Sequence, residues 1–141
     1  MNPNARRWLW TVVLVAAVLV QVVRTQDPST GTTGTDVAAA FDARASDVQL
    51  TAAGRVIRIL GDDNRGDRHQ RFIIRIGDEQ SVLVVHNIDL APRVPVSAGD
   101  SVDVFGEYVW NEQGGLIHWT HHDPDGSHVA GWIRHRGREY Q

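Results

Sequence analysis

The chain has 141 residues, 42% apolar and 22% charged, which suffices for one small domain and an accessory segment but not for two full hydrophobic cores. It contains no Cys, so a disulfide scaffold, a thiol nucleophile and a thiolate-bound zinc ion are excluded. All 14 basic residues are Arg, and the absence of Lys excludes Schiff-base chemistry and a phosphate-binding loop lysine.

The net charge of −3 is unevenly distributed along the chain. Arg6, Arg7 and Arg24 flank the first apolar run, so the remaining 11 Arg face all 17 acidic residues after Thr25. That part of the chain therefore carries −6 with its histidines neutral. Proteins that bind nucleic acid through its phosphates usually carry the opposite sign, so nucleic acid is a disfavoured partner.

The amino-terminal run Trp8–Val23 (WLWTVVLVAAVLVQVV) predicts a membrane helix within residues 1–26. At about 1.5 Å per residue it is somewhat short for a hydrocarbon core of about 30 Å, and the flanking residues extend it. Two Arg precede the run and one follows it, which places the amino terminus in the cytoplasm and the rest across the inner membrane. The alternatives are a cleaved signal peptide, which would make the domain secreted, and a helix of a soluble core.

A flexible linker is expected over residues 27–36, because DPSTGTTGT offers nothing apolar to bury. The folded domain is expected over residues 37–141. At its start, Asp36 predicts the cap of a short helix that has Val37, Phe41 and Arg44 on one face and ends near Asp47.

From Val48 onward, short β-type runs alternate with turn residues, which predicts an all-β domain. The run Ser81–His86 is nearly all apolar and is expected to be buried on both sides. The long segment Asn87–Asp100 holds two Pro and predicts an irregular connection. The predicted strands are Val48–Leu60, His69–Ile76, Ser81–His86, Ser101–Trp110 and Gly115–His121. Five strands with a long connection after the third favour a small OB-like barrel, with an open sandwich or meander as the alternative.

Several stretches of this domain carry a family resemblance. They are GRVIRILGDDNRGDRHQRF (Gly54–Phe72), HNIDLAPRVP (His86–Pro95), GEYVWNEQGGLIHWTHHDPDGSH (Gly106–His128) and GWIRHRGREYQ (Gly131–Gln141). With the run HWTHHDP in particular, the chain resembles a bacterial domain-of-unknown-function family, number thirty-four sixty-five. The resemblance covers Gly54 to Gln141 and implies a small exported domain. It brings no catalytic residue, because none is assigned in that family.

Histidine and aspartate are concentrated near the carboxyl terminus, which suggests a divalent metal such as zinc. The candidate ligands flank the turn Pro124–Gly126, which folds the chain back on itself. They are His121, His122, Asp123 and His128. Two alternatives stay open: the histidines hydrogen-bond loop carbonyls and each other, locking the carboxy-terminal segment onto the barrel, or they transfer protons in catalysis.

Other candidate residues come from the barrel surface and its aromatic side chains. Arg68 and Arg71 beside His69 suggest an anion site, with His69 as a candidate catalytic base. Trp119 and Trp132 suggest a platform that stacks sugars or bases. The alternatives are arginines paired with Asp62, Asp63 or Glu107, aromatic rings that fill the barrel and pin its tail, and a solvated turn at Asp62–Asp67 rather than a calcium loop.

The sequence therefore predicts a membrane-tethered, extracytoplasmic (periplasmic) binding module rather than an enzyme. Its histidine-rich end is expected to bind a divalent metal or a small polar or anionic ligand. One alternative is a metal-dependent phosphodiester hydrolase, which the charge of −6 disfavours. The other is a structural or assembly protein of the envelope, which the gathering of His and Asp disfavours.

Overall fold

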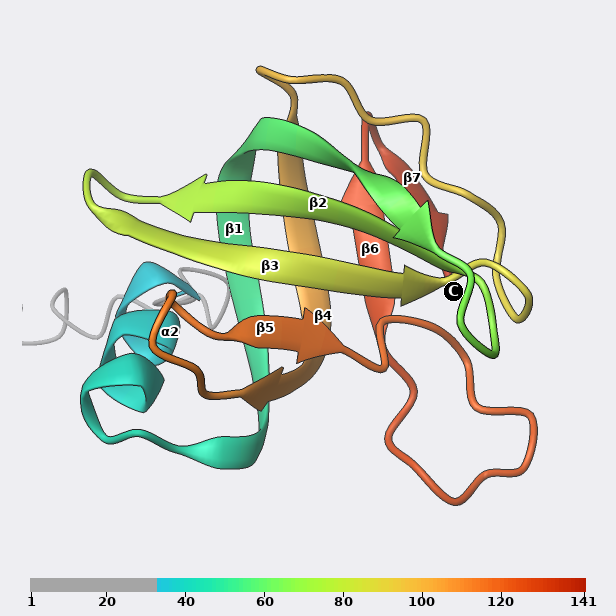
Figure 1. Cartoon of the computed structure of the whole chain (residues 1–141), viewed down its shortest axis with the longest axis horizontal. Coiled ribbons are helices and arrows are strands. Elements are labelled where there is room, and N and C mark those ends of the chain that lie inside the picture. Colours follow the sequence, from blue (N-terminus) through green and yellow to red (C-terminus); the bar gives the residue numbers. More distant parts are fainter. Residues whose placement is uncertain (1–32) are drawn as a thin grey trace, which may run out of the picture. The chain divides into compact units, whose positions relative to one another are not determined.

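The computed structural model of the chain describes residues 33–141, which form one short helix and seven strands (Figure 1). The elements are α2 (Thr33–Asp42), β1 (Ser46–Asp63), β2 (His69–Ile76), β3 (Gln80–Asn87), β4 (Ser101–Val109), β5 (Leu116–His118), β6 (Trp132–His135) and β7 (Arg138–Tyr140). The predicted anchor and most of the predicted linker lie outside the described residues. Within the part described, no helix is both long enough and apolar enough to cross a membrane.

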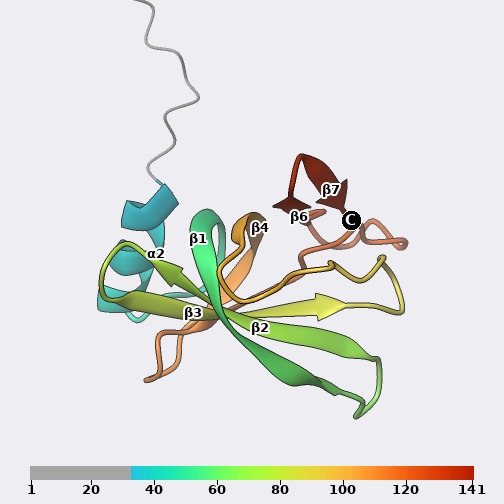
Figure 2. The same cartoon turned by 90° about the horizontal axis from the view of Figure 1, so that it is seen from above.

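Five strands close into a ring by hydrogen bonding in the order β1-β2-β3-β5-β4 and back to β1. All neighbours in the ring are antiparallel except β3 and β5, which run parallel. The prediction of an all-β domain with five ring strands is therefore confirmed. Two further strands extend β4 outside the ring, since β6 pairs with β4 and β7 with β6. Figure 2 shows this β6–β7 hairpin beside the carboxyl terminus.

The core follows from the two-residue alternation of side chains along each strand. In β2, Phe72, Ile74 and Ile76 are buried while Arg75 is exposed, as predicted. The prediction that Ser81–His86 is buried on both sides is wrong. The residues Val82, Val84 and His86 face the core, whereas Leu83 and Val85 are only half-buried on the outer face. That outer face of β2 and β3 is consequently open to form a site.

The helix α2 begins three residues before the predicted cap and ends at Asp42, earlier than predicted. It stops because Arg44 adopts a left-handed conformation with φ of 51°. The amides of Arg44 and Ala45 then bond back to the carbonyls of Phe41 and Ala40 at 3.0 and 2.9 Å, which is a Schellman ending. Val37 is fully buried in the core, as its place on the apolar face predicts.

The predicted strand Gly115–His121 is shorter in the structure, because β5 ends at His118. Trp119 takes a φ of 52°, which turns the backbone out of the strand. The chain then leaves the edge of β4 and returns to it as β6, which the sequence patterns did not predict. We call residues 119–131 the histidine loop.

The long connection between β3 and β4 holds neither helix nor strand, as predicted. It is fastened to the ring instead by side chains. The Gln70 amide donates to the Val94 carbonyl at 2.8 Å and accepts from the Val94 amide at 2.9 Å. Arg93 forms an ion pair with Asp62. The connection is thus held beside the β1–β2 hairpin.

Candidate functional site

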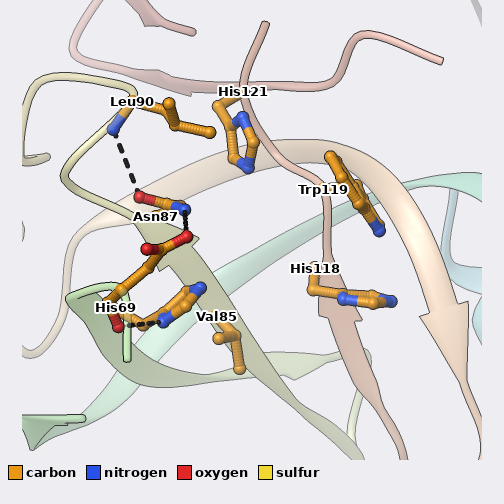
Figure 3. A pocket seen from close by; sticks show the side chains of 8 residues that line it. His69, Val85, Asn87, Leu90, His118, Trp119 and His121 are labelled. Carbon is orange, nitrogen blue, oxygen red and sulfur yellow. Dashed lines mark hydrogen bonds between the residues drawn. The ribbon is translucent and has the colours of Figure 1, made fainter. Parts of the chain in front are cut away.

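A cavity of about 300 Å³ lies on the outer face of β2 and β3 (Figure 3). The register of β2 against β3 places His69 opposite Asn87, and parallel pairing of β3 with β5 brings His118 near Val85. The histidine loop supplies the remaining wall. The lining residues are Asp67, His69, Val85, Asn87, Leu90, His118, Trp119 and His121.

The histidine loop is closed at its base and braced by a carboxylate. The Gly131 amide donates to the His121 carbonyl at 3.0 Å, which joins the two ends of the loop. Inside the loop, the Asp123 carboxylate accepts hydrogen bonds from the amides of Asp125, Ser127 and His128 at 2.7–3.1 Å. Burial alone would raise the pKa of Asp123, but these hydrogen bonds outweigh it and lower that pKa. Asp123 is therefore a turn-forming residue.

Glu107 on β4 holds two imidazoles, one on each side of the loop base. Its carboxylate oxygens lie 3.1 Å from His118 Nε2 and 2.8 Å from His128 Nε2. The Trp119 indole stacks on the His128 ring, with centroids 4.1 Å apart and an interplanar angle of 10°. This clamp of Glu107, His118, His128 and Trp119 fixes the wall of the cavity that the loop supplies.

The hydrogen-bond partners of His128 assign its protonation state. Its Nδ1 lies 3.0 Å from the Val129 carbonyl and its Nε2 faces the Glu107 carboxylate, so both nitrogens donate to oxygens that only accept. These two contacts favour the protonated, imidazolium form of the ring. Burial alone would lower the pKa of His128, but the hydrogen bonds to Val129 and Glu107 outweigh it and raise that pKa above the ordinary 6.5. In this form the His128 ring is a cation stacked on the face of the Trp119 indole, and the π electrons of the indole attract it.

His86 lies beneath the loop and is neutral. Its Nε2 donates to the Pro92 carbonyl at 3.2 Å, and its Nδ1 accepts from the Thr120 hydroxyl at 2.9 Å. Burial lowers the pKa of His86 to about 4. Since Pro92 lies in the connection after β3 and Thr120 in the histidine loop, this buried ring ties together the two segments that border the cavity.

Two of the lining histidines share one tautomer. In His69, Nδ1 donates to the Asp67 carbonyl at 2.8 Å, and in His121, Nδ1 donates to the His122 carbonyl at 2.8 Å. In the neutral rings, Nε2 therefore carries a lone pair, and neither Nε2 has a hydrogen-bond partner among residues 33–141. Figure 3 shows these two nitrogens pointing into the space between the rings. Each is available to accept a hydrogen bond from a bound molecule.

The four residues predicted to bind a metal do not converge on one site. His122 is exposed, the Asp123 carboxylate is occupied by turn amides, and His128 is engaged by Glu107. Of the four, only His121 lines the cavity. Across residues 33–141, no three His, Asp or Glu side chains are placed to hold one metal ion. The alternative expectation, histidines bonded to loop carbonyls, matches His121 and His128.

The residues predicted to bind a ligand divide into those at the cavity and those away from it. Arg68 is held by Asp89 at 2.7 Å and Arg71 by the Gly61 carbonyl at 2.9 Å, and neither lines the cavity. Trp132 lies on β6, and the Arg134 guanidinium covers its ring, with Cζ 4.0 Å from the ring centroid. Trp119 and the candidate base His69 do line the cavity.

Sequence reasoning missed Asp67, Val85, Asn87 and Leu90, which also line the cavity. The Asn87 side chain fixes the neighbouring turn, because its Oδ1 accepts from the amides of Asp89 and Leu90 at 2.9 and 3.2 Å. Its Nδ2 donates to the Asp67 carboxylate at 3.2 Å. An Asn directly after an apolar strand was the available signal for such a turn.

The imidazolium of His128 predicts a loop that loosens at alkaline pH. Because its pKa is raised in the folded chain, its contribution to stability is full below about pH 6.5 and is lost as pH rises through the folded pKa. Glu107→Gln is expected to lower the His128 pKa measured by NMR titration and to speed amide exchange in the loop. The control Glu112→Gln removes an exposed charge in the β4–β5 turn. Equal His128 pKa values in the two variants would contradict the clamp.

The ring of strands and the cavity define a small all-β domain with a histidine-lined cavity on its outer face. A family model described as "Protein of unknown function (DUF3465)" matches residues 18–141, and the chain belongs to this family. The match begins well before Gly54, so it includes the linker and the end of the apolar run, which the resemblance seen in the motifs left out. A search of the curated proteins found no match.

Proposed function

We propose that this chain is a binding module for a small polar molecule, built on an OB-type barrel. Support for the barrel comes from the ring order β1-β2-β3-β5-β4, with β3 and β5 parallel. OB barrels take ligands on the face of their second and third strands and beside the loop that joins the first two. The cavity lies on that face of β2 and β3 and includes Asp67 from that loop.

The observation that carries the proposal is the pair of unpartnered Nε2 atoms in one cavity, each on a ring that a backbone carbonyl holds in place. Groups held this way lose little side-chain entropy on binding. The lining residues include no Ser, Thr or Cys, so a hydroxyl or thiol nucleophile is missing from this cavity. A macromolecular polyanion is disfavoured by the charge of −6 after Thr25.

The same proposal includes a membrane tether. It is supported by the sixteen-residue run Trp8–Val23 and by its arginine flanks, which favour a domain outside the cytoplasm. A tethered periplasmic module meets small molecules that enter the envelope, which suits a cavity of this size.

Filling the cavity tests the proposal. Val85→Trp places a large ring in the cavity from the outer face of β3. Leu83→Trp is the matched control, because Leu83 lies on the same face and lines a separate cavity of about 330 Å³. A thermal-shift screen of amines, carboxylates, sugars and nucleotides is expected to give ligands that stabilise the wild type and Leu83→Trp but not Val85→Trp. Equal stabilisation of both variants, or no ligand at all, would refute a binding module at this cavity.

A further inference from the structure

Three side chains, His69, His121 and Asp67, offer hydrogen-bond acceptors to the cavity. The Nε2 atoms of His69 and His121 carry lone pairs in the neutral rings. The Asp67 carboxylate adds two acceptor oxygens, of which one receives the Asn87 amide. Asn87 itself has its oxygen occupied by two backbone amides. These acceptors favour a ligand that brings hydrogen-bond donors.

The charge around the cavity has the same implication. Asp67 lines the cavity and has no ion-pair partner among residues 33–141, while no lining residue is Arg. The neighbouring Arg68 is neutralised by Asp89 at 2.7 Å, and the Arg65 guanidinium by Asp63 at 3.2 Å. The domain as a whole is acidic. The field in the cavity thus favours a cation over an anion.

Apolar groups complete the lining of the cavity and indicate which chemical group the rest of the ligand carries. Val85 and Leu90 contribute aliphatic surface, and the Trp119 indole forms part of one wall (Figure 3). The Trp119 indole also contacts two imidazole rings. The His128 ring stacks on it with centroids 4.1 Å apart, and the His121 ring is tilted against it with centroids 5.5 Å apart. A short alkyl stem suits this surface, and an aromatic wall tolerates a nearby cation.

Resting on the function proposed above, we infer that the cavity takes an organic cation, a primary ammonium or guanidinium group on a short alkyl stem. His69 Nε2 and His121 Nε2 are the acceptors that line the cavity for its N–H groups, Asp67 supplies the opposing charge, and Val85 and Leu90 contact the stem. Such a group occurs both in free alkylamines and in Lys or Arg side chains of a peptide.

The test titrates the full-length chain, in mild detergent and with ¹⁵N-labelled histidine, with three probes. Butylammonium is the free amine, Nα-acetyl-lysine methylamide carries the same group as a side chain, and butanoate is an anion of matched length. The expected result is saturable shifts of the Nε2 signals of His69 and His121 with one or both cations and none with butanoate. A stronger response to butylammonium identifies a free amine as the ligand, and a stronger response to the lysine derivative identifies a peptide side chain.

Matched variants locate the binding. His69→Asn keeps a donor for the Asp67 carbonyl but removes the Nε2 acceptor, and Asp67→Asn removes the charge with little change of size. Each is expected to raise the Kd of the cation about tenfold, a loss typical of a charge-assisted hydrogen bond. The control Asp78→Asn removes an exposed carboxylate in the β2–β3 turn and is expected to leave the Kd unchanged.

Three results would overturn the inference. Butanoate or a sugar that binds and is excluded by Val85→Trp leaves the binding module intact but assigns it another class of ligand. Cation binding that survives both Asp67→Asn and His69→Asn places the cation elsewhere. Zn²⁺ that shifts both Nε2 signals while butylammonium shifts neither replaces the organic cation with a metal.

Discussion

Gly131→Ala is expected to destabilise the folded chain by about 3 kcal/mol or more, because the new methyl group has nowhere to go. An added Cβ would collide with the carbonyl oxygen of Trp119 and lie 2.5 Å from that of Phe105. Both obstacles are backbone atoms, which cannot rotate away as a flexible side chain would. The histidine loop crosses itself at this point, so relief of the collision must open the loop and displace Trp119 and His121 from the cavity.

Urea unfolding, monitored by tryptophan fluorescence, measures the decrease in the free energy of unfolding of Gly131→Ala. The matched control is Gly61→Ala, since no heavy atom lies within 4 Å of a Cβ added at Gly61 in β1. That control is expected to change the free energy of unfolding by less than about 1 kcal/mol. Equal midpoints for the two variants would mean that the base of the loop is looser than the structure shows.

Acidification is expected to destabilise the chain between pH 6.5 and pH 4, with His86 as a principal cause. Its folded pKa of about 4 lies below the 6.5 of an unfolded histidine, so the unfolded chain takes up the proton first. The contribution of His86 is therefore full above pH 6.5 and falls by about 3 kcal/mol as pH drops towards 4. Burial also lowers the pKa of His118, which adds a loss of the same sign.

The carboxyl groups whose pKa is lowered in the folded chain do not account for a loss in this window. The pKa values of Asp89, Asp100 and Asp123 are all lowered from 3.8, so their contributions are lost only at more acidic pH. The variant His86→Gln keeps a donor for the Pro92 carbonyl but cannot titrate. Denaturation across this pH range is expected to show a shallower slope for His86→Gln than for the wild type. Parallel slopes would remove His86 as a cause.

The pH range in which His86 loses its contribution to stability adjoins the range in which His128 loses its own, and the two ranges do not overlap. His86 weakens the fold as pH falls below 6.5, while the contribution of His128 is lost as pH rises through its raised pKa. Both act on the same cavity, since one ring lies under the histidine loop and the other belongs to the clamp on Glu107. The cavity is therefore expected to be best ordered close to neutral pH.

Local patterns in the sequence determined the elements of the ring. The two-residue spacing of Phe72, Ile74 and Ile76 sufficed for the bounds of β2, because strand periodicity is a property of neighbouring residues. The two Pro between Asn87 and Asp100 sufficed for the irregular connection. By contrast, β6 and β7 are three or four residues long and form by pairing on β4, which no local pattern reports.

The site itself was decided by tertiary structure. The sequence suggested His69, Trp119 and His121 as candidate site residues but grouped His121 with His122, Asp123 and His128, its neighbours in the chain. Folding separates them, because the loop turns at Trp119 and closes at Gly131, so that His128 reaches Glu107 and His121 faces His69. Which ring nitrogen holds the proton depends on the oxygen it meets, and those oxygens are positioned only by the folded chain.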